Sequence, residues 1–418
     1  MGLKRYKLGD LIEVTRGQSL AGEFYAEEGK YIRLTLGNFD YANGGFKPNT
    51  SKTNLYYTGP IKEQFILEEG DIITPLTEQT PGLLGSTARI PISGTYIQSQ
   101  DVALVRCKDG MIDPAFCYYL LPSSSVKKQL AAGAQQTKIR HTSPDKIKDV
   151  VVDIPDISEQ RQIGQLLDAI THKIELNRSI NQNLEALAKQ LYDYWFVQFD
   201  FPDEQGKPYK SSGGKMVWNE KLKREIPEGW ANCCMEAFLT IKNGRDHKHL
   251  KSGNYPVYGS GGEMRRVNEY LYNGESVLMP RKGSLNNIMY VNKSFWTVDT
   301  MFYSEMKIPH CAKYVFFTIK DIDFSRWDSG TGVPSMTAST LYTIPMVKPK
   351  DAILQRFDNV LAPLFQKLEQ VQLENESLTK QRDELLPLLM NGQVSLNSDL
   401  ANRDREVYRL YSSELMCW

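Results

Sequence analysis

The sequence predicts an α+β protein in which two similar mixed α/β domains are joined by two long antiparallel coiled-coil helices with pseudo-twofold symmetry. Two stretches with a hydrophobic heptad pattern, Ile163–Trp195 and Phe357–Leu389, superpose without a gap at an offset of 194 residues. Each stretch follows a segment of short strand-like runs separated by Gly, Asn and Pro turns. A chain of 418 residues is long enough for such a tandem duplication.

The duplication also predicts the domain boundaries. Between the two copies, residues 201–215 are rich in Pro, Gly, Ser and charge, which is typical of a linker. The expected order is a mixed domain at 1–155, a helix at 156–197, a linker at 198–224, a second mixed domain at 225–348, a second helix at 349–391 and an unassigned tail at 392–418.

Short runs rich in β-branched and aromatic residues predict the strands. In the first domain the expected strands are Tyr31–Leu36, Asp71–Thr74, Thr95–Ile97 and Val102–Cys107. In the second domain they are Tyr255–Tyr258, Ser276–Met279, Ile288–Val291 and Thr300–Met306. Helical patterns near 113–131 and 311–319 come late in each domain.

The two heptad stretches predict a coiled-coil seam between helices that are each about 50 Å long. If the helices pair antiparallel with aligned ends, Asn177 faces Asn375, and such polar seam residues fix the register. The alternative is a pair of amphipathic helices on separate cores. The predicted seam consists of Ile163, Leu167, Ile170, Ile174, Asn177, Asn181, Leu184, Ala188, Leu191 and Trp195 with Phe357, Leu361, Leu364, Leu368, Val371, Asn375, Leu378, Arg382, Leu385 and Leu389.

Composition excludes several classes of protein. The formal net charge is zero, which argues against an indiscriminate polyanion binder but allows basic residues to gather on one face. No apolar run approaches the ~20 residues that span a bilayer, and we expect a cytoplasmic protein without a secretory signal. The six cysteines form no C-x-x-C pair, so reduced, buried thiols are expected.

No catalytic or metal site stands out in the sequence. A Walker A pattern is absent, and the Gly-rich run Tyr258–Gly262 lacks the spacing of a dinucleotide cradle. His247 and His249 are expected to be solvated loop residues, because a metal site would need distant ligands. The pair Asp203–Glu204 lies in the expected linker, which cannot hold catalytic geometry. These observations favour a binding protein.

Polar clusters in both domains carry the residue types that contact phosphates and base edges. Glycines such as Gly17 and Gly244 recur at equivalent places and let backbone N–H groups approach a phosphate. A set of solvated loops is the alternative interpretation. The candidate DNA-binding residues are Arg16, Gln18, Asn49, Lys52, Gln135, Gln136, Lys138 and Arg140 in the first domain and Lys242, Arg245, Arg281, Lys282, Ser284, Asn286 and Thr331 in the second.

Several runs resemble the specificity subunits of type I restriction-modification systems, and the resemblance extends over most of the chain. The clearest is Pro155–Ile163, which leads into the first helix and its Asn177–Leu184 segment. Other matching runs are Trp195–Phe196, Phe201–Asp203, Glu225–Trp230, Tyr255–Gly262, Pro280–Ser284 and Phe295–Thr300.

The resemblance implies two target-recognition domains, each reading one half of a bipartite double-stranded DNA sequence. The helix pair would set the unread spacer and bind two modification subunits, which methylate adenine. S-adenosylmethionine, ATP and Mg²⁺ are expected on the modification and restriction subunits, and this chain is expected to be non-catalytic, with no cofactor of its own.

Two departures from the family pattern stand out. In the second copy Pro349 is followed by Lys350–Gln355, which lacks the first copy's motif, so unequal contacts with the two modification subunits are expected. The tail beyond Val394 lies outside the pattern. The alternative functions are a scaffold with two modules that bind other molecules, or a fragment of a single-chain restriction-methylation enzyme.

Overall fold

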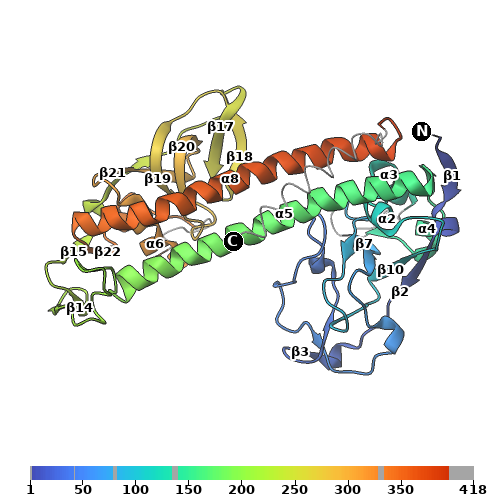
Figure 1. Ribbon diagram of the computed structural model, residues 1–418, viewed down its shortest axis with the longest axis horizontal. Coiled ribbons are helices and arrows are strands. Elements are labelled where there is room, and N and C mark those ends of the chain that lie inside the picture. Colours follow the sequence, from blue (N-terminus) through green and yellow to red (C-terminus); the bar gives the residue numbers. More distant parts are fainter. Residues whose placement is uncertain (1, 42, 79–81, 134–139, 328–333, 395–418) are drawn as a thin grey trace. The chain divides into compact units, whose positions relative to one another are not determined.

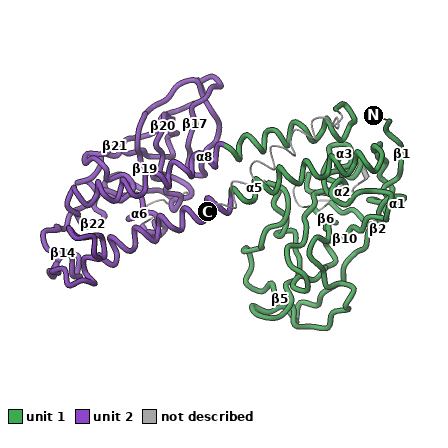
Figure 2. Tube along the Cα trace, viewed as in Figure 1, with its two compact units in different colours: residues 1–177, 374–418 green, residues 178–373 purple. Residues whose placement is uncertain are grey.

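The computed structural model describes residues 2–41, 43–78, 82–133, 140–327 and 334–394. The chain divides into two compact units, unit 1 with residues 1–177 and 374–418 and unit 2 with residues 178–373. As Figure 2 shows, each unit contains one strand-rich module and a part of each long helix. We call these the first module (in unit 1) and the second module (in unit 2). Among the described residues, no helix is long and apolar enough to cross a membrane.

The first module contains a four-stranded sheet in the order β2-β10-β6-β8 and a second one in the order β3-β5-β4-β9. Its strands are β1 (Lys4–Lys7), β2 (Ile12–Arg16), β3 (Tyr25–Ala26), β4 (Tyr31–Arg33), β5 (Tyr56–Tyr57), β6 (Ile72–Pro75), β7 (Thr77–Glu78), β8 (Ala88–Arg89), β9 (Tyr96–Ile97), β10 (Val102–Cys107), β11 (Arg140–His141) and β12 (Val151–Ile154). Its α-helices are α1 (Leu8–Leu11), α2 (Pro114–Leu120), α3 (Ser124–Gly133) and α4 (Pro144–Lys148).

The second module contains a six-stranded sheet in the order β16-β21-β19-β20-β17-β18 (Figure 1). The strands of unit 2 are β13 (Met216–Asn219), β14 (Arg224–Pro227), β15 (Ala231–Cys234), β16 (Leu239–Asn243), β17 (Ser252–Gly259), β18 (Gly262–Val267), β19 (Tyr272–Pro280), β20 (Met289–Thr297), β21 (Met301–Met306) and β22 (Pro345–Lys348). Its shorter helices are α6 (Ala312–Lys320) and α7 (Ala338–Tyr342).

The two modules share one topology, which confirms the duplicated fold expected from the sequence. In the first, β10 lies antiparallel between β2 and β6, and in the second, β21 lies antiparallel between β16 and β19. One parallel pair recurs as β4–β9 and as β17–β20. The first and last strands also pair in both modules, as β1–β12 and as β15–β22.

One expected strand is shorter than predicted. The run Tyr31–Leu36 forms β4 only as far as Arg33, and a 3₁₀ turn then covers Leu36–Asn38. Thr35 begins this turn because its hydroxyl accepts a hydrogen bond from the backbone N–H of Gly37. A side chain that caps the backbone locally competes with strand pairing, which explains the difference.

The long helices are α5 (Ile157–Tyr192), which continues as a π-helical turn at Asp193–Val197, and α8 (Asp351–Met390). Within each unit they pair antiparallel. In unit 1, Ile163 and Leu167 share a buried cluster with Leu389. In unit 2, the rings of Trp195 and Phe357 lie 5.5 Å apart. Every residue of the predicted seam is buried or half-buried.

The polar layer of the seam differs in detail from the expected Asn–Asn pair. In unit 1, Asn177 is 1% exposed and donates from Nδ2 to the carboxylate of Glu374 at 2.8 Å. Glu374 precedes Asn375, whose Oδ1 is buried and has no hydrogen-bond partner among the described residues. The hydrogen bond of Asn177 therefore goes to a carboxylate one residue away from the predicted partner.

Residues 198–224 are a folded part of unit 2. Phe201 stacks on Tyr209 and on Trp230, with ring centroids 4.7 and 4.9 Å apart. The carboxylate of Asp200 accepts hydrogen bonds from the backbone N–H and hydroxyl of Ser211 at 2.7 and 2.6 Å. The segment expected from its composition to be a linker is therefore folded, because Phe199 and Phe201 are buried among the aromatic side chains of the second module.

Candidate nucleic-acid interface

Each module carries a pocket at the same end of its main sheet, and three equivalent segments contribute to both pockets. The first segment follows the glycine after the outer strand, the second follows the strand of the parallel pair, and the third is the loop before the central strand. The pocket of the first module has a volume of about 350 Å³. Leu20, Leu34–Gly37 and Ser99–Asp101 line it from these segments.

The pocket of the second module repeats this arrangement with different side chains. It has a volume of about 600 Å³. Asp246–Lys248, Gly259–Gly261 and Val298–Thr300 line it from the three segments. Because the segments are far apart in the sequence, the polar clusters found there did not reveal either pocket.

A glycine holds the first and third segments together in both modules. A Cβ at Gly17 would lie 2.3 Å from the carbonyl oxygen of Ser99, and one at Gly244 would lie 2.0 Å from that of Val298. No side chain fits at such distances. These two glycines, which the sequence indicated as equivalent, therefore serve close packing against a backbone carbonyl.

A buried arginine stiffens the first pocket. Arg33 is only 7% exposed, and its guanidinium lies 3.9 Å from the ring centroid of Tyr25. It donates a hydrogen bond to the carbonyl of Asn54 at 3.1 Å. These contacts hold its charge against one wall of the pocket. Arg33 was not among the predicted DNA-binding residues because it lies in a strand.

Two predicted residues line the first pocket. Asn49 donates from Nδ2 to the hydroxyl of Thr35 at 2.8 Å, and its Oδ1 accepts from the backbone N–H of Ser51 at 2.9 Å. Its amide therefore holds the loop. Lys52 is exposed and forms no hydrogen bond or ion pair with any residue that the structure describes, so its ammonium is available for a phosphate.

The second pocket has a lysine in its lining, beside Asp246 and Asp299, and further basic residues next to it. Lys248 lines it, and the backbone N–H groups of Arg281 and Lys282 donate to the carbonyl of Thr300 at 2.8 and 3.2 Å. The side chain of Lys282 has no polar partner among the described residues, so its charge is available. The Nδ1 atom of His247 is buried and has no hydrogen-bond partner among the residues that the structure describes. His247 is therefore a pocket residue rather than a solvated one.

Other predicted residues have partners within the protein. Arg16 donates to the carbonyl of Gln100 at 2.8 Å, and Gln18 donates to that of Pro60 at 3.1 Å. Ion pairs join Arg140 to Glu78 and Lys242 to Glu305, and hydrogen bonds join Asn286 to Asp323 and to the backbone N–H of Phe324. These partners hold the side chains in place, and the donors that they leave free can still contact DNA.

The remaining candidates divide into two groups. Gln135, Gln136, Lys138 and Thr331 lie outside the described residues. Arg245 and Ser284 are exposed, and Arg245 donates through its backbone N–H to Thr297. For all of these residues, contact with DNA stays a prediction.

The described residues show no metal-binding group. Within the ranges that the structure describes, no three His, Cys, Asp or Glu side chains lie together in a way that could hold a metal ion. The arrangement offers two polar, partly basic pockets on strand-rich modules, which suits recognition of an extended anionic molecule.

An apolar stripe on the first long helix forms a second candidate surface. In unit 2, Ile180, Leu187 and Tyr194 are 39%, 43% and 38% exposed. Ile180 and Leu187 are seven residues apart on α5 and share one face of the helix, and Tyr194 lies in the π-helical turn that follows. This face is distinct from the seam that packs on α8.

Comparisons with known proteins agree with this arrangement. Residues 2–186 and 227–379 match the family model described as the type I restriction modification DNA specificity domain. The two matched ranges follow the two copies of the duplication.

Curated relatives and a solved structure give the same result. The specificity subunit of the type I restriction enzyme MjaIX from Methanocaldococcus jannaschii is 25% identical over 350 residues, 75% of this chain and 78% of that protein. A putative type I specificity subunit of Mycoplasma pneumoniae is 25% identical over 398 residues, covering 91% and 93%. The crystal structure of a type I restriction-modification S subunit from M. genitalium has a TM-score of 0.61 at 20% identity, covering 93% and 96%. That last likeness shows a shared fold.

Proposed function

Because the chain belongs to the type I restriction modification DNA specificity domain family and so recognises DNA sequence, we propose that each module reads one half of a bipartite target. The observation that carries the proposal is the pair of equivalent pockets, one on each module. The three segments occupy equivalent places in the two pockets, but the side chains that line the pockets differ. Two sites of one design and different chemistry suit two different half-sites.

The long helices would set the distance between the half-sites. Both modules are followed directly by such a helix, and the two helices pair antiparallel within each unit. DNA rises ~3.4 Å per base pair, so helices about 50 Å long suit half-sites on the order of 10–15 base pairs apart.

This chain would supply recognition, and other subunits the chemistry. Two modification subunits would bind the helices, and the exposed stripe of Ile180, Leu187 and Tyr194 is a surface that suits such contact. These subunits would bind S-adenosylmethionine and methylate adenine, while restriction subunits would use ATP and Mg²⁺. The neutral net charge of this chain agrees with DNA binding through a few basic side chains at defined positions.

The decisive experiment is methylome sequencing of cells that carry this chain with its modification subunit. We expect methylated adenines within a single asymmetric motif made of two short sequences and a fixed unread gap. Methylation in a continuous motif, or none that depends on this chain, would contradict the proposal. A chain in which the second module is replaced by that of a relative should change one half of the motif and leave the other unchanged.

A further inference from the structure

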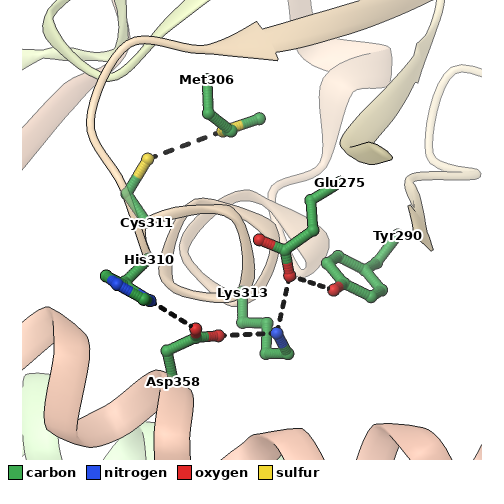
Figure 3. Close-up of polar contacts among 7 residues, drawn as sticks. All are labelled: Glu275, Tyr290, Met306, His310, Cys311, Lys313 and Asp358. Carbon is green, nitrogen blue, oxygen red and sulfur yellow. Dashed lines mark hydrogen bonds and ion pairs between the residues drawn. The ribbon is translucent and has the colours of Figure 1, made fainter. Parts of the chain in front are cut away.

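A buried lysine in the second module joins the sheet to the long helix. The side chain of Lys313 is 5% exposed. Figure 3 shows its Nζ atom between two carboxylates, with Glu275 at 2.7 Å and Asp358 at 2.6 Å. Glu275 also accepts a hydrogen bond from the hydroxyl of Tyr290, and Nδ1 of His310 lies 2.8 Å from the second oxygen of Asp358.

The members of this cluster come from different elements. Lys313 lies on α6, Glu275 on β19, Tyr290 on β20 and Asp358 on α8. Burial, and then the hydrogen bond to Glu275, raise the pKa of Tyr290, so its hydroxyl stays a donor. The ammonium group of Lys313 therefore links β19 directly to α8, and it links β20 to α8 through Glu275.

The strand in this cluster leads directly to the pocket. β19 ends at Pro280, and the next residues are Arg281 and Lys282, whose backbone N–H groups bond to the pocket residue Thr300. Glu275 lies six residues before Arg281 on the same extended chain. A displacement of β19 relative to α8 would therefore move these basic side chains relative to the helix.

The equivalent contact of unit 1 carries no charge. Lys313 is the second residue of α6 and Asp358 the eighth of α8, and their counterparts are Ala115 and Gly164, second in α2 and eighth in α5. A Cβ at Gly164 would lie 2.8 Å from that of Ala115. Close contact alone joins the first module to its helix at this point, and its ion pair, Arg89 with Asp168 at 2.8 Å, lies one turn further along α5.

A buried ion pair does more to fix the relative position of two elements than to stabilise the fold. Removing charges from water costs about as much as their attraction returns, so apolar side chains of similar size stabilise equally well. Hydrogen bonds to both carboxylates, however, depend on distance and direction and so restrict the relative position of the strand and the helix. Apolar surfaces permit small shifts at low cost.

We propose that Lys313 is a positioning residue for DNA recognition, which fixes the second module on α8 and thereby the distance between the half-sites. This inference rests on the proposed function. Lys313 does not touch DNA itself; it acts through Glu275 and β19 on the placement of Arg281 and Lys282. Without the cluster, the second module keeps its fold but accepts targets with altered spacing.

The test measures binding of the full chain with its modification subunits to DNA duplexes with the mapped spacer, and with one base pair more or less. Since a wrong distance abolishes simultaneous binding of linked modules, we expect wild type to prefer the correct spacer about 10²-fold. In Lys313→Met, affinity for the correct spacer should change less than about threefold and the preference should fall to about tenfold or less. Lys313→Arg, which keeps both ion pairs, should retain the preference.

A second variant excludes the effect of uncompensated charge. Lys313→Met combined with Glu275→Gln and Asp358→Asn removes all three charges. This triple variant should melt at a higher temperature than Lys313→Met and show the same relaxed preference for spacer length. Equal loss of affinity at every spacer with a lowered melting temperature indicates a merely structural role and overturns the inference. A wild-type protein without any spacer preference would instead contradict the proposed function.

Discussion

The two units build the same helix contact from opposite chemistry. In unit 1, Gly164 of α5 packs on Ala115 of α2 with no room for a further carbon atom. In unit 2, Asp358 of α8 binds the buried Lys313 of α6 at 2.6 Å. Both members of the pair differ between the copies, so the position has kept its role while its chemistry has changed in concert.

One turn further along the helices the polarity is reversed. In unit 1 the hydroxyl of Tyr119 donates to the carboxylate of Asp168 at 2.9 Å and lies 2.9 Å from the hydroxyl of Thr171. Burial raises the pKa of Tyr119 and keeps this donor protonated. At the equivalent positions of unit 2, the rings of Phe317 and Phe365 lie 6.2 Å apart.

The difference teaches that each module and its helix form a matched pair. Each interface has one polar and one apolar level, in opposite order. Exchange of a single residue between the copies would leave a charge or a hydroxyl without its partner, which is costly when the group is buried. Substitutions that move residues between copies therefore test the comparison most directly.

The largest effect is expected where the copies agree. Gly17→Ala and Gly244→Ala each force a methyl group against a backbone carbonyl that cannot move freely, and each should destabilise its unit by about 3 kcal/mol. Urea unfolding gives the loss, and hydrogen exchange assigns it to one unit. Losses well below those of ordinary core substitutions at both sites would contradict the close packing of the two glycines against these carbonyls.

A transplanted carboxylate should have the next largest effect. Gly164→Asp places a charged side chain against Ala115 and within 3.0 Å of an oxygen of Asp113, at a cost of about 2–3 kcal/mol in unit 1. Addition of Ala115→Lys supplies the cation of unit 2 and should recover part of this loss. If the double variant is no more stable than the single one, the two contacts are not interchangeable.

A transplanted aromatic ring tests the second level. Tyr119→Phe removes the hydroxyl that binds Asp168 and should cost about 1 kcal/mol. The reverse change, Phe317→Tyr, places a hydroxyl among the aromatic rings of unit 2 and should also destabilise. An increase in unfolding free energy for either variant would show that polarity at this level is not matched to the helix.

The smallest effect on stability is expected at the pocket margins. Lys52→Ala and Lys282→Ala remove exposed side chains and should change unfolding free energy by less than about 0.5 kcal/mol. Each should nevertheless reduce the slope of log binding constant against log salt by about one, on all DNA sequences. A slope unchanged in one variant only would show that just one module uses this phosphate contact.

Features that depend on nearby residues could be predicted from the sequence. Apolar residues at intervals of three and four gave both long helices, and the antiparallel register that placed Trp195 against Phe357 follows from the same pattern. The strand β10 was predicted with its observed limits, Val102–Cys107, because an apolar run lies between turns.

Features that depend on distant residues could not. The partners of Lys313 lie 38 and 45 residues away, and the lysine itself stands in an apolar run that suggests an ordinary core helix. Both pockets combine three separate segments. Asn286 was predicted to bind DNA from its residue type alone, which did not reveal that its amide donates to Asp323. The residue type does not reveal whether the polar group of a side chain already forms a hydrogen bond within the protein.

The pairing of first and last strands has a consequence for the time course of folding. Lys4 pairs with Ile154, 150 positions further along, so β1 must wait until the whole first module has been synthesised. At ~5–20 residues per second this takes on the order of 10 seconds, during which the strand has no partner. The ribosome then produces α5 directly after β12. Closure of the module and emergence of its helix thus fall at nearly the same moment, whereas the core of unit 1 waits for Leu389 of α8 near the end of the chain.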